Sequence, residues 1–150
     1  MTAKEYLRQY GQLKREVLRL IDERQRWVDL ATRITPAYSD APAGGSGGDG
    51  KIPAAVERII GQEEKIDAKV RELMAVLDDI EGKIAGLEDE RQREILRRRY
   101  IAGQKWEEIA REMHYGYQWV CKLHGRALLK IKEAIKSDIE AIESDTPPVL

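Results

Sequence analysis

Residues 105–132, KWEEIAREMHYGYQWVCKLHGRALLKIK, decide the fold of the C-terminal part of this chain. Apolar residues recur in the first part at i, i+3, i+4 and i+7, the spacing of one helical face: Trp106, Ile109, Ala110 and Met113. A three-residue break that ends in Gly116 is followed by a second stripe, made of Val120, Leu123, Ala127, Leu128 and Ile131. This spacing predicts two helices joined by a tight turn, the layout of a helix-turn-helix.

The second of these helices carries a polar and basic face between its apolar positions. A helix of that kind fits the major groove of DNA, where its first turns contact base edges. We therefore expect four residues to face the groove: Tyr117, Gln118, Cys121 and Lys122. The expected phosphate contacts are Lys105, Arg126 and Lys130, with guanine as a second target for Lys122 and Arg126. The alternative is a solvated basic face that binds nothing.

Trp119 lies between the groove-facing and the core-facing sides of the same helix. It either covers the edge of the domain or meets a partner, or it contacts the DNA backbone or thymine methyl groups. Trp106 shares the first apolar stripe, which places it in the core. For His114 and His124 we expect packing or hydrogen bonds at helix ends.

The composition favours long helices over a large globular core. Charged residues make up 35% of the 150 residues and aromatic residues 6%, and no segment alternates with period two, so we predict an all-α fold. No apolar run approaches the roughly 18 residues of a membrane span. The N-terminus has no signal-peptide core, and a single Cys fits a reducing compartment. These features indicate a cytoplasmic protein without a membrane partner.

The net charge of −1 conceals an asymmetry along the chain. Residues 90–136 contain 12 Lys and Arg against 6 Asp and Glu, a net charge of +6, so the remainder carries −7. A basic module on an acidic body favours nucleic-acid binding at one end of the chain.

Two longer segments each carry a heptad seam, with alternating steps of four and three residues. In residues 2–34 the seam is Tyr6, Tyr10, Leu13, Val17, Leu20, Arg24, Trp27, Ala31 and Ile34. In residues 54–88 it is Ile59, Glu63, Ile66, Val70, Leu73, Leu77, Ile80, Ile84 and Leu87. An antiparallel register that pairs the apolar members also brings Arg24 to Glu63. Because a lone charge in a seam is costly and a charged pair can fix register, we predict a long antiparallel helical hairpin, a coiled coil with this pair in its seam.

A parallel pairing of each helix with its copy is the alternative, and it is disfavoured because it sets Arg24 against Arg24. Residues 35–53, rich in Pro, Gly and Ser, are the predicted flexible linker. Residues 89–136 form the predicted helix-turn-helix domain, which needs a third, supporting helix at its start. Residues 137–150 are the predicted tail.

Other chemistry finds little support in the sequence. Residues 45–51, GSGGDGK, match the first part of a phosphate-binding loop, but Ile52 stands where Ser or Thr would hold magnesium. Cys121, His124 and His114 are of the types that bind zinc, but His124 falls on the inner side of its helix and no second ligand pair accompanies them. No nucleophile and base set can be argued. We expect no enzymatic activity, no metal and no cofactor.

The C-terminal segment resembles region 4 of bacterial sigma factors. The matching positions are residues 96–100 (LRRRY), Gly103, residues 106–110 (WEEIA), Val120 and residues 126–131 (RALLKI). The resemblance implies DNA binding and transcriptional control. Lys105 stands where the family usually has Ser or Thr, and Gly116 where it has a capping Ser, for which Gly is an acceptable replacement. Cys121 stands where sigma factors often place a base-contacting Arg, so the family's promoter preference does not carry over.

The whole chain is also similar to a set of proteins encoded by phages and prophages of Gram-positive bacteria. The similarity covers the N-terminal helix, the linker ITPAYSDAPAGGSGGDG and the sequence YQWVCKLHGRAL. These proteins are related to ArpU-type and RinA-type regulators of late phage transcription. The similarity does not imply a complete sigma factor, which also needs a promoter-melting domain with clustered exposed aromatic residues.

We therefore expect a sequence-specific DNA-binding regulator of phage genes in the cytoplasm of the bacterial host. The expected partners are double-stranded DNA, host RNA polymerase and a second copy bound through the coiled coil. Two alternatives stay open at this point: a DNA-packaging component similar to a small terminase subunit, and an adaptor whose basic face binds an acidic protein.

Overall fold

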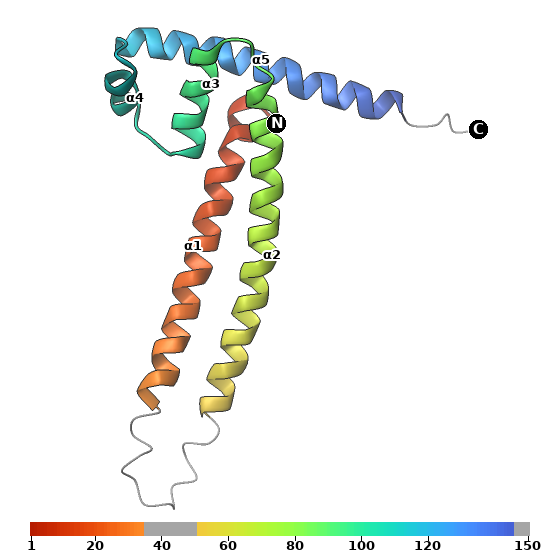
Figure 1. Ribbon diagram of the computed structural model, residues 1–150. Helices are drawn as coiled ribbons and strands as arrows, with labels where there is room; N and C mark the ends of the chain where they lie inside the picture. The colour runs from red at the N-terminus through yellow and green to blue at the C-terminus, as the bar shows by residue number, and fades with distance from the viewer. Residues whose placement is uncertain (35–50, 146–150) are drawn as a thin grey trace, which may run out of the picture. The chain divides into compact units, whose positions relative to one another are not determined.

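The computed structural model describes residues 1–34 and 51–145. Its regular elements are all helical: α1 (Ala3–Ile34), α2 (Lys51–Ala85), α3 (Glu90–Leu96), the π-helical turn η2 (Arg97–Ile101), α4 (Trp106–Met113) and α5 (Tyr117–Ser144) (Figure 1). The predicted all-α fold is thereby confirmed. Within the described part of the chain, no helix is both long and apolar enough to cross a membrane.

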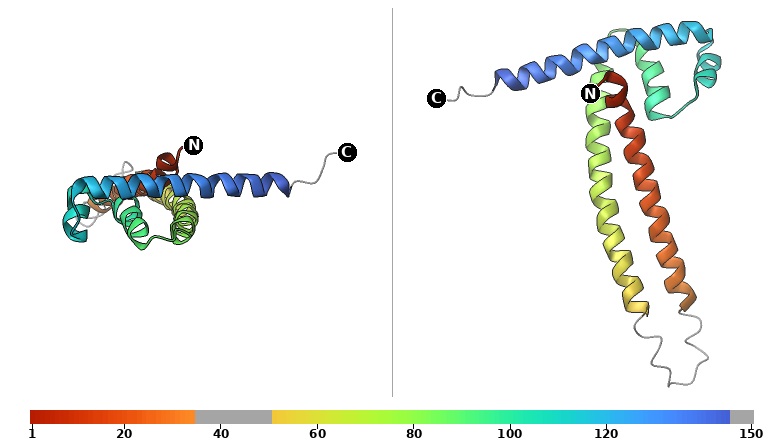
Figure 2. Two further views of the ribbon diagram at one scale, coloured as in Figure 1. Left: turned by 90° about the horizontal axis from the view of Figure 1, so that it is seen from above. Right: turned by 180° about the vertical axis from the view of Figure 1, so that it is seen from behind.

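The chain divides into two compact units. One comprises residues 13–74 and the other residues 1–12 and 75–150. Within the first, the part of α1 that follows residue 12 and the part of α2 that precedes residue 75 lie side by side and run antiparallel (Figure 2). This pair of helices is called the helical pair below.

Two ion pairs define the register of the helical pair. The Arg24 guanidinium lies 2.7 Å from Glu63 Oε1, and Lys69 Nζ lies 3.1 Å from Glu16 Oε2. The charged seam residues Arg24 and Glu63 therefore meet each other, and Glu16 and Lys69 pair beside the seam. Buried apolar side chains are few among the described residues of this unit, namely Leu13, Val17 and Ala55. Two helices alone give each seam residue only one neighbouring helix to pack against.

In the other unit, the first core lies where the start of α1, the end of α2, α3 and α5 converge. Its buried members are Ala3, Tyr6, Leu7, Ile80, Ile84, Leu87, Leu96, Ala127 and Ile131. A reciprocal cap begins α1: Thr2 Oγ1 accepts from the Glu5 backbone N–H at 3.1 Å, and Glu5 Oε2 accepts from the Thr2 N–H at 2.8 Å. The cap fixes the start of the helix beside this core.

The second core belongs to α3, α4 and α5. Its buried members are Ile95, Ile109, Ala110, Val120 and Leu123, and Trp106, Met113, Tyr115 and Trp119 pack around them. The apolar stripes of residues 105–132 thus face each other across the turn between α4 and α5. This core positions the surface considered next.

Two helix boundaries differ from those expected from the sequence. The second long helix begins at Lys51, not at residue 54, because Pro53 in the first turn blocks no backbone hydrogen bond there. The last helix continues to Ser144, although a tail was expected from residue 137. Lys83 Nζ lies 2.7 Å from Asp138 Oδ2, which ties the extended part of α5 to α2. The rest of the predicted linker, residues 35–50, and the last five residues, 146–150, lie outside the described ranges.

Candidate nucleic-acid interface

The start of α3 is held by local side-chain contacts. Asp89 is its N-cap, and Asp89 Oδ1 accepts from the Arg91 backbone N–H at 2.8 Å. The hydrogen bond from the Arg91 side chain holds the pKa of Asp89 below its usual range. Arg93 Nη1 donates to the Glu88 carbonyl at 3.1 Å. These contacts fix the direction in which α3 leaves the preceding loop.

A wide turn leads from α3 to α4. In η2 the Ala102 N–H donates to the Arg97 carbonyl at 2.9 Å, five residues back, which is the π-helical pattern. Gly103 then takes a φ of 70°, in the left-handed region where a residue without Cβ is favoured. The chain can therefore reverse direction before α4 begins at Trp106.

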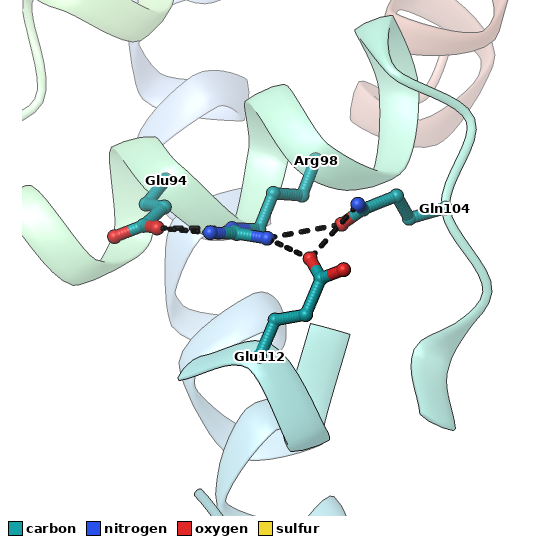
Figure 3. A network of polar contacts seen from close by, with 4 residues as sticks. All are labelled: Glu94, Arg98, Gln104 and Glu112. Carbon is teal, nitrogen blue, oxygen red and sulfur yellow. Dashed lines mark hydrogen bonds and ion pairs between the residues drawn. The ribbon is translucent and has the colours of Figure 1, made fainter. Parts of the chain in front are cut away.

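A polar network joins the supporting helix to α4 (Figure 3). Arg98 lies between Glu94, at 2.8 Å, and the pair formed by Gln104 and Glu112. Gln104 Nε2 also donates to Glu112 Oε2 at 2.9 Å. Because its members come from α3, η2, the following loop and α4, the network resists sliding of α4 along α3.

The turn between α4 and α5 is closed by His114. This residue has φ 59° and ψ 38°, the left-handed conformation that ends many helices, and the next N–H, of Tyr115, donates to the Ala110 carbonyl at 2.9 Å. Gly116 caps α5 with φ −69°, a conformation open to any residue. The sequence analysis predicted a turn that ends in Gly116, whereas the left-handed backbone conformation in this turn is that of His114.

His124 is the buried polar residue beneath this surface. Its Nε2 lies 2.7 Å from the hydroxyl of Tyr100, and the Trp106 ring meets it edge-on at 4.5 Å between centroids. Burial, followed by the nearby charges of Lys4, Arg99 and Arg8, lowers the pKa of His124 to about 4. The imidazole is therefore neutral near pH 7, and it packs α5 against η2 and α4.

Seven of the eight residues expected to bind DNA lie on α5, where they divide into three groups by direction, and the eighth is Lys105. At 100° per residue, Gln118 points directly away from the second core, and Lys122 lies on the same outward side about 40° from it. Tyr117 and Cys121 lie along one edge of α5, and both are exposed. The other edge carries Trp119, Arg126 and Lys130, while Lys105 precedes α4 as an exposed N-cap. Cys121 and His124 do not come together, because one is exposed and the other buried.

Two arginines from different helices flank Trp119. The guanidinium carbons of Arg91 and Arg126 lie 5.7 Å and 5.4 Å from the centre of the indole ring. Stacking of this kind is favourable and limits the positions that a guanidinium can take. Half-buried Trp119 thus covers the edge of the domain and holds two cations beside the exposed face of α5.

Sequence reasoning had not singled out Arg91, Arg99 or Tyr100 as functional residues. Arg99 lies over the Trp106 ring at 4.7 Å and donates to the Gln104 carbonyl at 3.0 Å. The run Arg97-Arg98-Arg99 was visible only as positive charge. Its three members diverge in the π-helical turn, because Arg97 turns to Glu81, Arg98 to Glu112 and Arg99 to Trp106.

Comparison with known families accounts for this part of the chain. Residues 89–133 match the family model "Sigma-70, region 4". They form a helix-turn-helix of the DNA-binding, transcription-related kind. The match covers less than a third of the chain, and the helical pair lies outside it. Neither curated proteins nor solved structures show a significant match to the chain.

Proposed function

We propose that this protein is a sequence-specific DNA-binding regulator of phage genes that acts beside the RNA polymerase of its bacterial host. The observation that carries the proposal is the exposed start of α5, where Gln118 and Lys122 project from a segment similar to sigma region 4. The first turns of a second helix are the part that enters the major groove in this motif. In this proposal Tyr117 and Cys121 contact bases or methyl groups along one wall of the groove.

Phosphate contacts in the proposal come from the opposite edge of α5. Trp119 lies within stacking distance of both Arg91 and Arg126, so their guanidinium groups are partly ordered before DNA arrives. Contacts to phosphate set the position of a protein on the duplex, whereas contacts to base edges supply sequence preference. Lys105 and Lys130 add cations at either end of the same surface, although Lys130 also lies 3.7 Å from Glu133.

Selection of bound duplexes from a random pool, followed by titration, tests the DNA contacts. Tyr117→Ala combined with Lys122→Ala should reduce affinity for the selected sequence at least tenfold and weaken the preference. Arg126→Ala should weaken binding to all sequences alike and make it less sensitive to salt. With about four phosphate contacts, the logarithm of affinity should fall against the logarithm of salt concentration with a slope of roughly −3.6.

Lys136→Ala supplies the matched control, because Lys136 is an exposed cation on the same helix beyond the proposed contacts. Equal losses for Lys136→Ala and for the Tyr117 and Lys122 double variant would contradict the groove assignment. Selection that returns no sequence preference would contradict the role as a sequence-specific regulator.

The role in phage transcription rests on the similarity to phage-encoded regulators. A genome-wide footprint of the tagged protein after prophage induction should place it at phage promoters, and polymerase subunits should copurify with it. The proposal includes a cytoplasmic location, a homodimer formed through the helical pair, and no catalytic activity. The mass in solution separates it from a DNA-packaging component, since a packaging subunit forms a ring of many copies.

A further inference from the structure

One side of the helical pair carries apolar side chains that the pair itself leaves exposed. They are Leu18 and Ile21 on α1 and Val56, Ile60, Val70 and Met74 on α2, with exposed fractions between 36% and 54%. This set is called the open apolar face. Leu18 and Ile21, the α1 row, are three residues apart, and the members of the α2 row form two pairs with a step of four residues, which are the steps of a helix that packs against another helix.

The two rows lie on the same side of the pair. Leu18, Ile21 and Ile60 each directly follow a seam residue, which turns them by about 100° from the line of contact between the helices. In antiparallel helices, equal turns toward higher residue number lead to the same side. This conclusion follows from the register that the Arg24–Glu63 ion pair defines.

Polar contacts cross the opposite side of the pair. Gln62 Nε2 donates to Glu23 at 2.9 Å, and the Arg58 guanidinium lies 5.3 Å from the Trp27 ring. Glu23, Arg58 and Gln62 each directly precede a seam residue, which turns them away from the open apolar face, and Trp27 lies in the seam itself. One side of the pair is therefore bridged by polar groups, and the other presents aliphatic side chains to solvent.

The open apolar face is large enough to form an interface between two protein chains. The exposed surface of its six residues adds up to that of two to three fully exposed aliphatic residues, on the order of 500 Å². Two such faces in contact remove roughly 1,000 Å² from water, the lower bound for a specific protein interface. We propose that the open apolar face binds the same face of a second copy, with the two helical pairs antiparallel, to form a four-helix bundle.

The charges that flank the face select both the partner and the orientation. Arg15 and Asp29 flank the α1 row, and Glu57 and Arg71 flank the α2 row, all exposed. An antiparallel arrangement about a two-fold axis near Asp22 sets Arg15 against Asp29 of the second copy and Arg71 against Glu57 of the second copy. A parallel arrangement would instead set Arg15 beside Arg71 and Asp29 beside Glu57, which repel.

The same axis also matches five of the six residues of the open apolar face. It sets Val56 against Met74 and Ile60 against Val70, while Ile21 approaches its own counterpart. The unfavourable contact is Asp67 against Glu63 of the second copy, where two carboxylates meet and only Glu63 has an ion-pair partner, Arg24, among the described contacts. This contact offers a way to strengthen the dimer by substitution.

Sedimentation of the full chain over a range of concentrations tests the proposal. The wild type should dimerise, and Leu18→Asp combined with Ile60→Asp should weaken dimerisation at least 100-fold with unchanged helical circular dichroism. Leu30→Asp is the matched control, because Leu30 is 44% exposed on the bridged side and should not change dimerisation. A wild type that stays monomeric at all concentrations, or a double variant that dimerises like the wild type, would overturn the proposal.

Two further variants test the orientation without depending on loss of association. Asp67→Lys should strengthen dimerisation about tenfold, because a cation then faces Glu63 of the second copy. In a Cys121→Ser background, Ile21→Cys should form a disulfide between copies on mild oxidation, whereas Leu30→Cys should not. Weaker association of Asp67→Lys, or a disulfide through Leu30→Cys in preference to Ile21→Cys, would contradict the antiparallel arrangement.

The inference names the surface for the homodimer included in the proposed function. Its experiments contain no DNA, and the DNA titrations use variants outside residues 13–74. Failure of one proposal is therefore distinguishable from failure of the other.

Discussion

The second core and the helical pair are built from the same kind of apolar helical stripe, but they bury it to different degrees. Ile95, Ile109 and Leu123 have no exposed surface, whereas Val70 in the seam of the pair is 36% exposed. Around the second core, residues of three helices converge and cover each side chain from several directions. Two antiparallel helices cover each other along one line and leave their flanks to solvent. Equal sequence patterns therefore contribute unequally to stability.

The largest expected effect is that of truncating a side chain in the second core. Leu123→Ala removes a side chain with no exposed surface, so the free energy of unfolding should fall by about 2–5 kcal/mol. At concentrations where the protein is monomeric, Val70→Ala should cost about 1 kcal/mol or less, because its site in the single chain is already open to water. Urea denaturation of both variants, followed by circular dichroism, measures the difference. Equal losses would show that the helical pair is enclosed in solution as well as the second core.

Acidification should act next most strongly, through His124 in the unit that contains the second core. Burial lowers its pKa to about 4, below the usual value near 6.5, so the unfolded state binds the proton more readily. The stability that depends on the neutral imidazole is present above pH 6.5 and declines as pH falls toward 4, by about 3 kcal/mol in total. Urea titrations at pH 7 and at pH 4.5 measure this change.

His124→Gln provides the control for acidification, because glutamine can bond the Tyr100 hydroxyl but does not titrate. The wild type should lose more stability between the two pH values than this variant does. An equal loss in both proteins would assign the pH dependence to carboxylates elsewhere in the chain.

In the helical pair, the charged register contact should have a smaller effect. Arg24→Glu should destabilise the pair by about 1 kcal/mol, because the Arg24 and Glu63 side chains are 36% and 49% exposed and solvent screens them. Glu63→Arg should cost a similar amount, and the double swap should restore most of the loss. Thermal denaturation of the four proteins gives the comparison, and a double variant no better than the single ones would argue against the register.

The smallest effect is expected at the turn before α5. Gly116 caps this helix without a side-chain hydrogen bond, and a Cβ at this position would meet no atom within 4 Å. Gly116→Ser should therefore raise stability by a few tenths of a kcal/mol, by adding an acceptor for the first N–H groups. Gly103→Ser is the contrasting variant, since Gly103 has a φ of 70° and should lose stability. The reverse order in thermal denaturation would contradict the assigned backbone conformations.

Periodicity was sufficient to predict the helices and the stripes that meet in the second core. Trp106 to Met113 and Val120 to Ile131 face each other because helical spacing and the turn leave few other ways to bury them. The extension of α5 to Ser144 escaped prediction because Ser137 and Asp138 were read as its end, although Ile135, Ile139 and Ile142 keep the helical spacing of four and three residues. Residues 137–144 remain helical through good helix formers, the Lys83–Asp138 ion pair and the absence of Gly or Pro before residue 147.

The arrangement around Trp119 could not be derived from the sequence. Arg91 lies 28 positions before Trp119, and their contact depends on the angle between α3 and α5, which no local pattern encodes. The burial of His124 was partly foreseen, from its place beside Leu123. The hydrogen bond between His124 and Tyr100 was not foreseen, because the π-helical turn rotates Tyr100 away from the direction that a regular helix would give it.

The unbroken course of α5 gives the C-terminal unit a mechanical property. Its 28 residues form one rod about 42 Å long, which begins at the proposed DNA contacts and ends beyond the first core. If the rod turned as a rigid body about its middle, near Ala127 and Ile131, a tilt of about 10° would displace each end by roughly 3–4 Å. Ala127 and Ile131 are fully buried along the rod and would be the pivot of such a movement. The helix can therefore pass a movement at its proposed DNA-facing end to its opposite end, as a displacement of similar size.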